Sequence, residues 1–552
     1  MTTPESPAPP GVGRELPDRT ATRRLCAGVY LDPGFRDAVL HRVYNARKRR
    51  VAPSYGYDLV PVVTHAWRAW WLSTVGDAVL LTLCCAAILL YPLPALLAAV
   101  ALFDIGLVAA LVTYATRSVR ALGHRYTDAP DPDPDTDDDA DADTDTPRWR
   151  RTLGYDLVVA ALVTVGVVAG VRGSAGDGVF LTAAAIALTL CAVLAVLGTL
   201  RQLAVNRLRA HGTDPRRPRT RGRLAVIESQ QRHPLVVYSG ASPFVGSGSG
   251  LRTWSFAQRL IEAKPLGVDK DVEFEKKPFA TRELVEELRR AITALDTEED
   301  PETRLPGLRV LDSLFVEGRY ARDYADDLEP AARAGLVERI LDRPQETARH
   351  YLTCQVESWG GEVVTTVFVH VSLQGRTMYI EFSSRALAPT RLAYQVVDTI
   401  GGTGTLATLR AAALHGGRIR DIALAPLRLL RAPLPLLGAL GAGSDATVAQ
   451  LKRGRDVGAD CSARELAAIG ADENYFQTFD VVKHLKIIEQ RLLSTVGDYL
   501  TERGVDTSEF RRRATAILNN GVISTGNSGI IQTGSGDIDV SGAMGEGTSV
   551  GK

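Results

Sequence analysis

Residues 72–115 read LSTVGDAVLLTLCCAAILLYPLPALLAAVALFDIGLVAALVTYA, with no basic residue. The run is about twice the roughly 20 residues that one helix needs to cross the hydrocarbon core of a bilayer. Proline starts a helix well but does not continue one, so Tyr91-Pro92-Leu93-Pro94 divides the run into helices at 72–91 and 95–115. The run therefore predicts a membrane hairpin.

A second apolar region has the same form. Residues 155–171 and 179–200 are apolar, and the short polar segment 172–178 joins them, so we expect a second hairpin. The predicted fold class is a membrane all-α part, with four transmembrane helices in two hairpins, plus a cytoplasmic α+β domain and a β-prone repetitive C-terminal tail.

Basic residues flank this membrane part. Residues 14–50 contain ten Arg or Lys and four acidic residues, and residues 201–223 contain eight Arg and one acidic residue. Because basic flanks are retained in the cytoplasm, we expect the N- and C-termini to be cytoplasmic. Arg far outnumbers Lys, which is typical of GC-rich bacterial genomes, so the expected localisation is the bacterial plasma membrane, crossed several times.

The region after the membrane part alternates between strand and helix patterns. Strand character is found at 223–228, 234–239, 363–373 and 376–384. The last two alternate with period two around Gln374-Gly375, which predicts a β-hairpin. Helical spacing at 281–295 and 330–341 completes an α+β domain.

The following residues favour helices. Residues 419–440 are apolar but contain three Arg and three Pro, so we expect them either along the cytoplasmic membrane interface or buried within the domain. Residues 474–503 form a long helix with one apolar stripe, which docks on its own domain or on a partner helix. A capping sequence at 506–509 starts another short helix.

The expected organisation has eight parts. They are a basic cytoplasmic N-terminal region (1–71), transmembrane hairpin 1 (72–115), an acidic disordered cytoplasmic loop (116–154), transmembrane hairpin 2 (155–200), a basic linker (201–222), the cytoplasmic α+β domain (223–400), a helical cytoplasmic region (401–518) and a Gly/Asn-rich amyloid-like tail (519–552).

Composition limits the possible functions. Basic and acidic residues balance at 64 each, so net charge gives no indication of a nucleic-acid partner. The six cysteines include no C-x-x-C pair, and the nine histidines are scattered, so neither a metal site nor a cofactor is expected. No zinc-protease, nucleophile-elbow or kinase signature is present. We therefore expect a protein that is not an enzyme.

Two features are candidate polar sites. Asp104 is the only ionisable residue near the middle of an expected span, where it either relays a proton or cation or hydrogen-bonds a neighbouring helix. Gly246, Gly248 and Gly250 alternate in a loop whose amides either cradle an anion or form a plain connection, since the loop lacks the lysine of a P-loop. A second glycine pattern at 402–407 lacks the strands and helices of a dinucleotide fold.

The tail contains a repeat of eight residues. It reads NNGVISTG at 519–526, NSGIIQTG at 527–534 and SGDIDVSG at 535–542. Identical spacing lets such units stack as rungs of a cross-β structure, with Ile above Ile. The alternative is a flexible Gly/Ser tail.

The tail also carries a resemblance. Ile531-Gln532-Thr533-Gly534 resembles the core of RHIM-type amyloid signalling motifs and their bacterial counterparts, which implies assembly through Ile530, Ile531, Gln532 and Gly534. The rest of the chain, through SPFVGSG at 242–248 and WSF at 254–256, resembles uncharacterised actinobacterial polytopic membrane proteins.

These observations lead to three hypotheses. The first is a membrane-anchored signalling or effector protein that assembles with itself, or with a partner protein bearing a similar tail, while its helices contact the lipid bilayer. The second is a small transport or channel component that uses Asp104. The third is a membrane-tethered domain with a ligand site at 242–256, possessing either binding or enzymatic activity.

Overall fold

The computed structural model describes residues 20–107, 177–210, 220–263, 272–328, 335–343, 346–399, 402–416, 418–439, 447–468, 474–519, 523–526 and 529–532. The chain divides into two compact units. The sheet unit comprises Met1–Ala66, His211–Val396 and Gly438–Lys552, and the helical unit comprises Trp67–Ala210 and Val397–Leu437. Helix α3 (Leu59–Leu90) begins in the sheet unit and ends in the helical unit.

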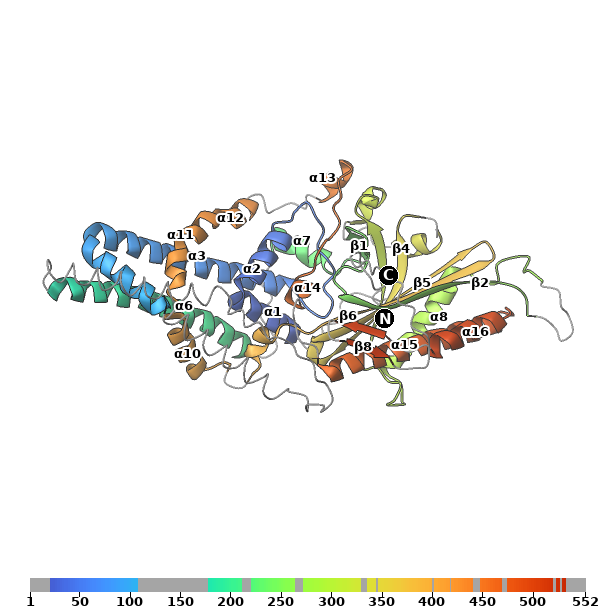
Figure 1. Ribbon diagram of the computed structural model, residues 1–552. Coiled ribbons are helices and arrows are strands. Elements are labelled where there is room, and N and C mark those ends of the chain that lie inside the picture. The colour runs from blue at the N-terminus through green and yellow to red at the C-terminus, as the bar shows by residue number, and fades with distance from the viewer. Residues whose placement is uncertain are drawn as a thin grey trace, which may run out of the picture. The chain divides into compact units, whose positions relative to one another are not determined.

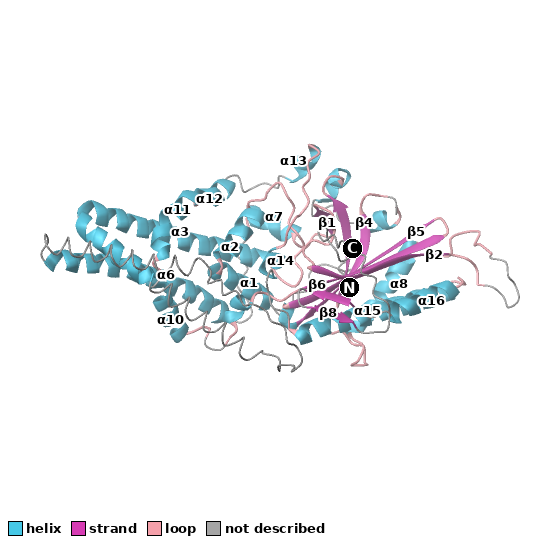
Figure 2. Cartoon of the chain, viewed as in Figure 1, coloured by secondary structure: helices cyan, strands magenta, loops and turns pink. Residues whose placement is uncertain are grey.

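A six-stranded mixed sheet lies at the centre of the sheet unit (Figure 2). Its strands are β1 (Leu235–Tyr238), β2 (Ser249–Arg259), β3 (Arg309–Glu317), β4 (Arg349–Ser358), β5 (Val363–Gln374) and β6 (Thr377–Leu387). Their order across the sheet is β1-β3-β4-β5-β6-β2. β1 is parallel to β3, and the other neighbours are antiparallel. β1 and β2 are therefore the edge strands.

Three helices cover one face of this sheet: α8 (Thr281–Thr293), α15 (Tyr475–Glu502) and α16 (Ser508–Asn519) (Figure 1). The buried residues of α15 include Leu485, Ile488 and Leu492, which are three or four residues apart and so lie on one side of the helix. They pack in the same core as the apolar residues of β4, β5 and β6. Burial of this apolar area stabilises the sheet unit.

Aromatic side chains pack against the opposite face. Phe244 stacks on Phe368 with ring centroids 4.3 Å apart, and both rings also contact Phe315 and Tyr351. Phe244 comes from the loop that precedes β2, so this cluster fixes that loop on the sheet.

The N-terminal helices also belong to the sheet unit. They are α1 (Thr20–Leu31), α2 (Pro33–Ala38) and the π-helix η1 (Val39–Tyr44). One carboxylate oxygen of Asp32 caps α2, and the other accepts hydrogen bonds from Arg391 (2.8 Å) and Tyr394 (2.7 Å). A Cβ at Gly28 would lie 2.8 Å from the Tyr394 ring, so only glycine fits this contact.

The helical unit contains a helix at Pro92–Leu107, α6 (Asp177–Ala210), α10 (Thr405–Gly416), α11 (Arg420–Arg431) and most of α3 and of α12 (Pro433–Ala439). Glycines allow its helices to approach closely. A Cβ at Gly76 would lie 2.6 Å from Leu197, and one at Gly198 would lie 2.6 Å from His415. The contacts of α3 with α6 and of α6 with α10 thus depend on small residues.

The prediction of four transmembrane helices is wrong. Within the described residues, two helices are long and apolar enough to cross a membrane, Leu59–Leu90 and Gly178–Arg209. Proline ends α3 near the expected place, but the next helix is described only over Pro92–Leu107, which at 1.5 Å per residue is shorter than the roughly 30 Å hydrocarbon core. The expected span at 155–171 and the acidic loop lie outside the described residues.

The prediction of an α+β domain is confirmed by the sheet and the helices that cover it. The expected hairpin is formed by β5 and β6, and the expected helices at 281–295 and 474–503 correspond to α8 and α15. The expected strand at 223–228 is wrong, because these residues form helix α7 (Arg223–Gln230). The remaining short helices are η2 (Ala294–Asp296), η3 (Ala321–Tyr324), η4 (Asp326–Leu328), α9 (Leu336–Leu341), η6 (Trp359–Gly361), η7 (Leu392–Val397), α13 (Thr447–Lys452) and α14 (Ala463–Ala468).

Candidate functional site

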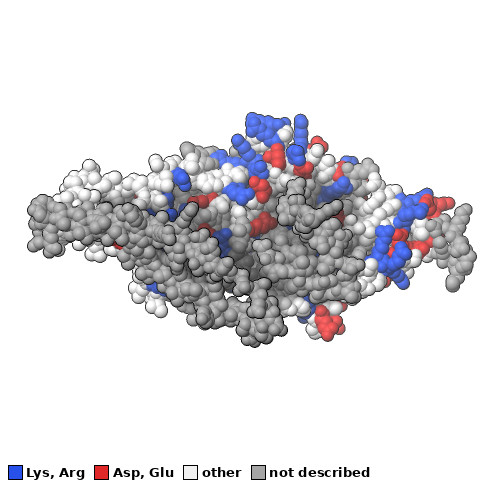
Figure 3. Space-filling view, in the orientation of Figure 1, with Lys and Arg blue, Asp and Glu red and all other residues white. Residues whose placement is uncertain are grey.

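The most prominent surface feature of the helical unit is its exposed apolar side chains. Leu89 and Leu90 at the end of α3, and Leu181 and Leu188 on α6, are each at least 70% exposed. The described surface over the outer part of α3 is accordingly white in Figure 3, without Lys, Arg, Asp or Glu. Monomeric soluble proteins rarely expose apolar surface of this extent. This surface is therefore suited to an apolar environment.

Polar contacts join the helices at the start of the apolar part of α3 and at the end of the apolar part of α6. Arg201 on α6 donates to the Ser73 hydroxyl on α3 at 3.2 Å, which places the start of the apolar part of α3 beside the end of that of α6. The two helices are therefore antiparallel. Farther along α6, Asn206 donates to Thr408, and Arg209 donates to Thr403.

An ion-pair network also joins α3 and α11. Arg428 on α11 lies 3.5 Å from the buried carboxylate of Asp77 on α3, and it also binds Asp421 at 2.8 Å. Asp77 was not among the residues predicted from the sequence, although it is one of two acidic residues, with Asp104, in the apolar run at 72–115. Asp104, the residue that the sequence singled out instead, lies in the Pro92–Leu107 helix and is partly buried.

The glycine loop of the sheet unit does hold a carboxylate, and it comes from the chain itself. Oε1 of Glu465, on α14, accepts hydrogen bonds from the amides of Gly246 (2.8 Å) and Gly248 (3.1 Å). Burial raises the pKa of Glu465, although these hydrogen bonds and Arg385 oppose the shift. Gly250 lies at the start of β2 and contributes no amide to this contact. The loop thus binds an internal group.

The Gly248 position also explains why the loop is rich in glycine. Its φ is +88°, and a Cβ would lie 2.1 Å from the carbonyl oxygen of Ala386. Only glycine reaches this left-handed conformation without strain and leaves room for the neighbouring strand.

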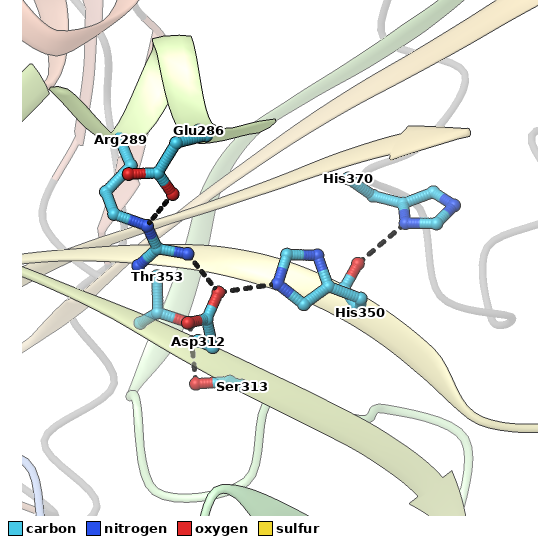
Figure 4. Close-up of polar contacts among 7 residues, drawn as sticks. All are labelled: Glu286, Arg289, Asp312, Ser313, His350, Thr353 and His370. Atoms are coloured by element: carbon cyan, nitrogen blue, oxygen red, sulfur yellow. Dashed lines mark hydrogen bonds and ion pairs between the residues drawn. The ribbon is translucent and has the colours of Figure 1, made fainter. Parts of the chain in front are cut away.

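A second polar cluster links α8 to the sheet (Figure 4). Asp312 on β3 accepts hydrogen bonds from Arg289 at 2.5 Å and from Nε2 of His350 at 2.8 Å. Burial alone would raise the pKa of Asp312, but these two hydrogen bonds and the Arg289 charge outweigh it and hold the pKa below its usual range. Arg289 also donates to Glu286, three residues earlier on α8.

Two histidines in this cluster have defined roles. Nδ1 of His370 lies 2.7 Å from the carbonyl oxygen of His350, so that nitrogen carries the hydrogen. Burial lowers the pKa of His370 to about 4, which keeps its ring neutral at physiological pH. Nδ1 of the buried His350 makes no hydrogen bond within the described part of the chain and faces a small pocket lined also by Arg349 and Ser372.

This cluster is a connection between elements and lacks the parts of a nucleophilic site. The hydroxyls of Ser313 and Thr353, although close in sequence to Asp312 and His350, bond to each other at 2.8 Å (Figure 4). Among the residues that the structure describes, no three His, Cys, Asp or Glu side chains are grouped so that they could hold a metal ion.

The described residues 523–526 and 529–532 of the tail form two paired strands, one in each of the first two repeats. Strands β7 (Ile523–Gly526) and β8 (Gly529–Gln532) are antiparallel, with Ser524 opposite Ile531 and Thr525 opposite Ile530. Three residues of the expected assembly motif, Ile530, Ile531 and Gln532, thus have β backbone conformation, and Gly534 lies outside the described residues.

Comparison with protein families decides the relationship of the chain. A family model described as an AbeC-like domain matches residues 253–532, about half of the chain. The chain belongs to the AbeC-like domain family. The matched region begins within β2 at Thr253 and ends with β8 at Gln532, so the AbeC-like domain includes five sheet strands, helices α10–α12 and the tail hairpin. Comparisons with curated proteins and with solved structures found no match.

Proposed function

We propose that this protein is a membrane-anchored signalling or effector protein, whose helical unit is held in a bilayer and whose sheet unit and tail bind partner proteins. The observation that carries the proposal is the exposure of α3 and α6. In the most apolar 18-residue window of each helix, 17% of the residues are buried. A core helix of a soluble protein would be mostly buried, because leaving apolar surface in water costs about 25 cal/mol per Å².

The dimensions of the helices agree with this role. The apolar part of α6 runs from Gly178 to Leu200, which at about 1.5 Å per residue exceeds the roughly 30 Å thickness of the hydrocarbon core. Exposed leucines are present near the start and the middle of this part, at Leu181 and Leu188. A helix of this length and exposure is suited to lipid.

The charges at the helix ends support one orientation. Arg68 precedes the apolar part of α3, and Arg201, Arg207 and Arg209 follow that of α6. Because the two helices are antiparallel, these residues lie at the same end of the pair. Basic flanks favour the cytoplasmic side, so the sheet unit and both termini are cytoplasmic in this proposal.

The tail supports the assembly part of the proposal. Four residues in each of its first two repeats have strand conformation, in β7 and β8, and short repeated segments of this kind stack into cross-β structures. The partner is a second copy of the chain or a protein with a similar tail.

Membrane anchoring is tested with charged substitutions on the exposed apolar face. An Arg at the centre of a spanning helix costs about 2.5–3.5 kcal/mol on insertion scales. Leu188→Arg should therefore reduce the amount of protein in the membrane fraction after alkaline carbonate washing. Leu311→Arg, at an exposed leucine of the sheet unit, is the matched control and should leave the fraction unchanged. Release of the unsubstituted protein by carbonate would contradict the proposal.

Orientation is tested separately by labelling single cysteines in a cysteine-free background. Tyr91 lies exposed at the far end of α3, and Glu302 lies on an exposed loop of the sheet unit. In intact cells a membrane-impermeant thiol reagent should label Tyr91→Cys and should label Glu302→Cys only after lysis. The reverse pattern would place the sheet unit outside the cell.

A further inference from the structure

An exposed aromatic cluster lies on the sheet unit. Tyr475, Phe476 and Phe479 occupy the first turns of α15 and are 67%, 64% and 56% exposed, and Trp359 in η6 is 48% exposed. The Trp359 indole N–H donates to Asp480 at 2.9 Å. The Tyr475 and Phe476 rings are in contact, with centroids 5.7 Å apart, Phe479 follows Tyr475 by one helical turn, and Asp480 follows Phe476 by one turn. The four rings are therefore gathered at the start of α15, and we term them the aromatic patch.

The structure holds these rings in place. Asn474 and Gln477 form a capping box that fixes the first turn of α15. Trp359 has φ +55°, the only positive φ of a non-glycine residue in the described part of the chain, and Gly360 and Gly361 beside it are also left-handed. Such a backbone costs about 1–3 kcal/mol and persists only where surrounding contacts impose it. The backbone conformation of Trp359 is therefore imposed by the fold.

The chemistry of the patch matches a membrane interface. Tryptophan and tyrosine are enriched at the level of lipid headgroups, where one part of the ring contacts apolar chains. The Trp359 N–H is already bonded to Asp480, so the ring enters such a surrounding without an unpaired donor. Lys483 is exposed one turn after Phe479, and its ammonium group complements lipid phosphate.

We propose that the aromatic patch is a second membrane contact, through which the sheet unit binds the headgroup region of the bilayer that anchors the chain. The inference rests on the proposed function, because α3 begins within the sheet unit at Leu59 and its apolar part would keep that unit near the membrane. The partner of the patch is thus a lipid surface containing anionic phosphate.

The experiment uses an environment-sensitive fluorophore on single cysteines of the full chain. The protein is reconstituted in vesicles of phosphatidylcholine and phosphatidylglycerol with and without a doxyl-labelled lipid. Phe476→Cys reports on the patch, Leu89→Cys on α3, and Glu302→Cys on a surface remote from both features in sequence. We expect blue-shifted emission and doxyl quenching at positions 476 and 89 but not at 302.

The reporters separate the two proposals. Quenching at 89 without quenching at 476 would overturn the patch inference and leave membrane anchoring intact, whereas absence of quenching at 89 would overturn anchoring itself. A blue shift at 476 without doxyl quenching would indicate a protein partner and would also overturn the inference.

Substitutions supply the second readout. Phe479→Ser combined with Trp359→Ser should markedly reduce quenching at 476 and leave it unchanged at 89. Tyr379→Ser, at an exposed aromatic residue of β6, is the matched control and should change neither value. Replacing phosphatidylglycerol by phosphatidylcholine should weaken the signal at 476 if Lys483 contributes, and Lys483→Gln should remove that lipid dependence.

Discussion

Asp77 on α3 lies 3.5 Å from Arg428 on α11, so a carboxylate within an apolar helix pairs with a guanidinium from a helix more than three hundred residues later. Removing one partner of a buried ion pair costs about 3–5 kcal/mol because the other charge stays unpaired. Arg428 is partly exposed and also binds Asp421. We therefore expect Arg428→Leu to reduce stability by an amount at or below the lower end of this range.

The position of α11 provides the measurement. An ideal Cβ on Gly106 lies 3.8 Å from the Cβ of Ile419, a separation suited to a disulfide. Gly106→Cys with Ile419→Cys should therefore crosslink under oxidation, and Arg428→Leu should reduce the yield. Adding Asp77→Asn should restore part of it, because a neutral amide then replaces the buried carboxylate. Equal yields in all variants would show that the pair does not hold α11.

Glu465 should make the stability of the sheet unit depend on pH. Its pKa is raised by burial, so the folded protein binds a proton more readily than the unfolded chain, and the resulting stability is present below the ordinary pKa and lost as pH rises through the raised value. Because Oε1 accepts both loop amides, Glu465→Gln should keep these bonds and remove the pH dependence. Thermal unfolding of the full chain in mild detergent measures this.

Controls separate charge from contact at this position. Glu465→Ala should lower stability at every pH, since two partly buried amides lose their acceptor, at a cost of up to about 1–3 kcal/mol each. Glu302→Gln, on an exposed loop, should leave the pH profile unchanged. A Glu465→Gln protein that retains the full pH dependence would assign that dependence to another group.

Asp312 should give the stability of the sheet unit the opposite dependence on pH. Its pKa is lowered by His350 and Arg289 despite burial, so its contribution is present above the ordinary pKa and is lost as pH falls through the lowered value. Asp312→Asn should lower the free energy of unfolding by about 2 kcal/mol at neutral pH, typical of hydrogen bonds to charged groups. Glu299→Gln, at an exposed residue, should change it little. Equal losses at pH 7 and at strongly acidic pH would argue against a charge effect.

The tail repeat predicts fibril formation. A peptide covering Asn519 to Gly542 should form thioflavin-positive fibrils with a strand spacing of about 4.7 Å. Replacing Ile531 by Pro and Gln532 by Asp should abolish them, because proline removes a backbone donor and stacked aspartates repel. A peptide that stays monomeric at high concentration even after seeding would remove the assembly part of the proposed function.

Local sequence patterns predict those elements whose conformation is determined by their own residues. The β5–β6 hairpin and helix α15 have sequence periods of two and of three to four, and both have these conformations in the structure. α7 shows the limit of this approach. Its six apolar and polar residues at 223–228 fit either a strand or a helix, and the buried Arg223, which donates to the carbonyl oxygens of Val43, Tyr44 and Ala46, belongs to a contact distant in sequence.

For the candidate sites too, local features could be recognised in the sequence but contacts between distant residues could not. The alternating glycines left two possibilities open, amides that cradle an anion or a plain connection, and in the structure the amides of Gly246 and Gly248 donate to a carboxylate of the chain itself. That the carboxylate is Glu465, more than two hundred residues away, follows only from tertiary structure. Strands β3 and β4 were not predicted either. Both include a polar residue, Asp312 and His350, and the contacts that Asp312 makes with Nε2 of His350 and with Arg289 are visible only in the tertiary structure.

The order of the strands has a consequence for synthesis on the ribosome. β2 ends at Arg259, but its only sheet neighbour, β6, begins at Thr377. The nascent chain therefore exposes an eleven-residue edge strand throughout the translation of α8, β3, β4 and β5. Non-local pairing of this kind folds slowly and leaves strands open to wrong partners. A pause in elongation before residue 387 should increase the fraction of misfolded chains far more than the same pause placed after β6. Low chaperone capacity should also increase that fraction.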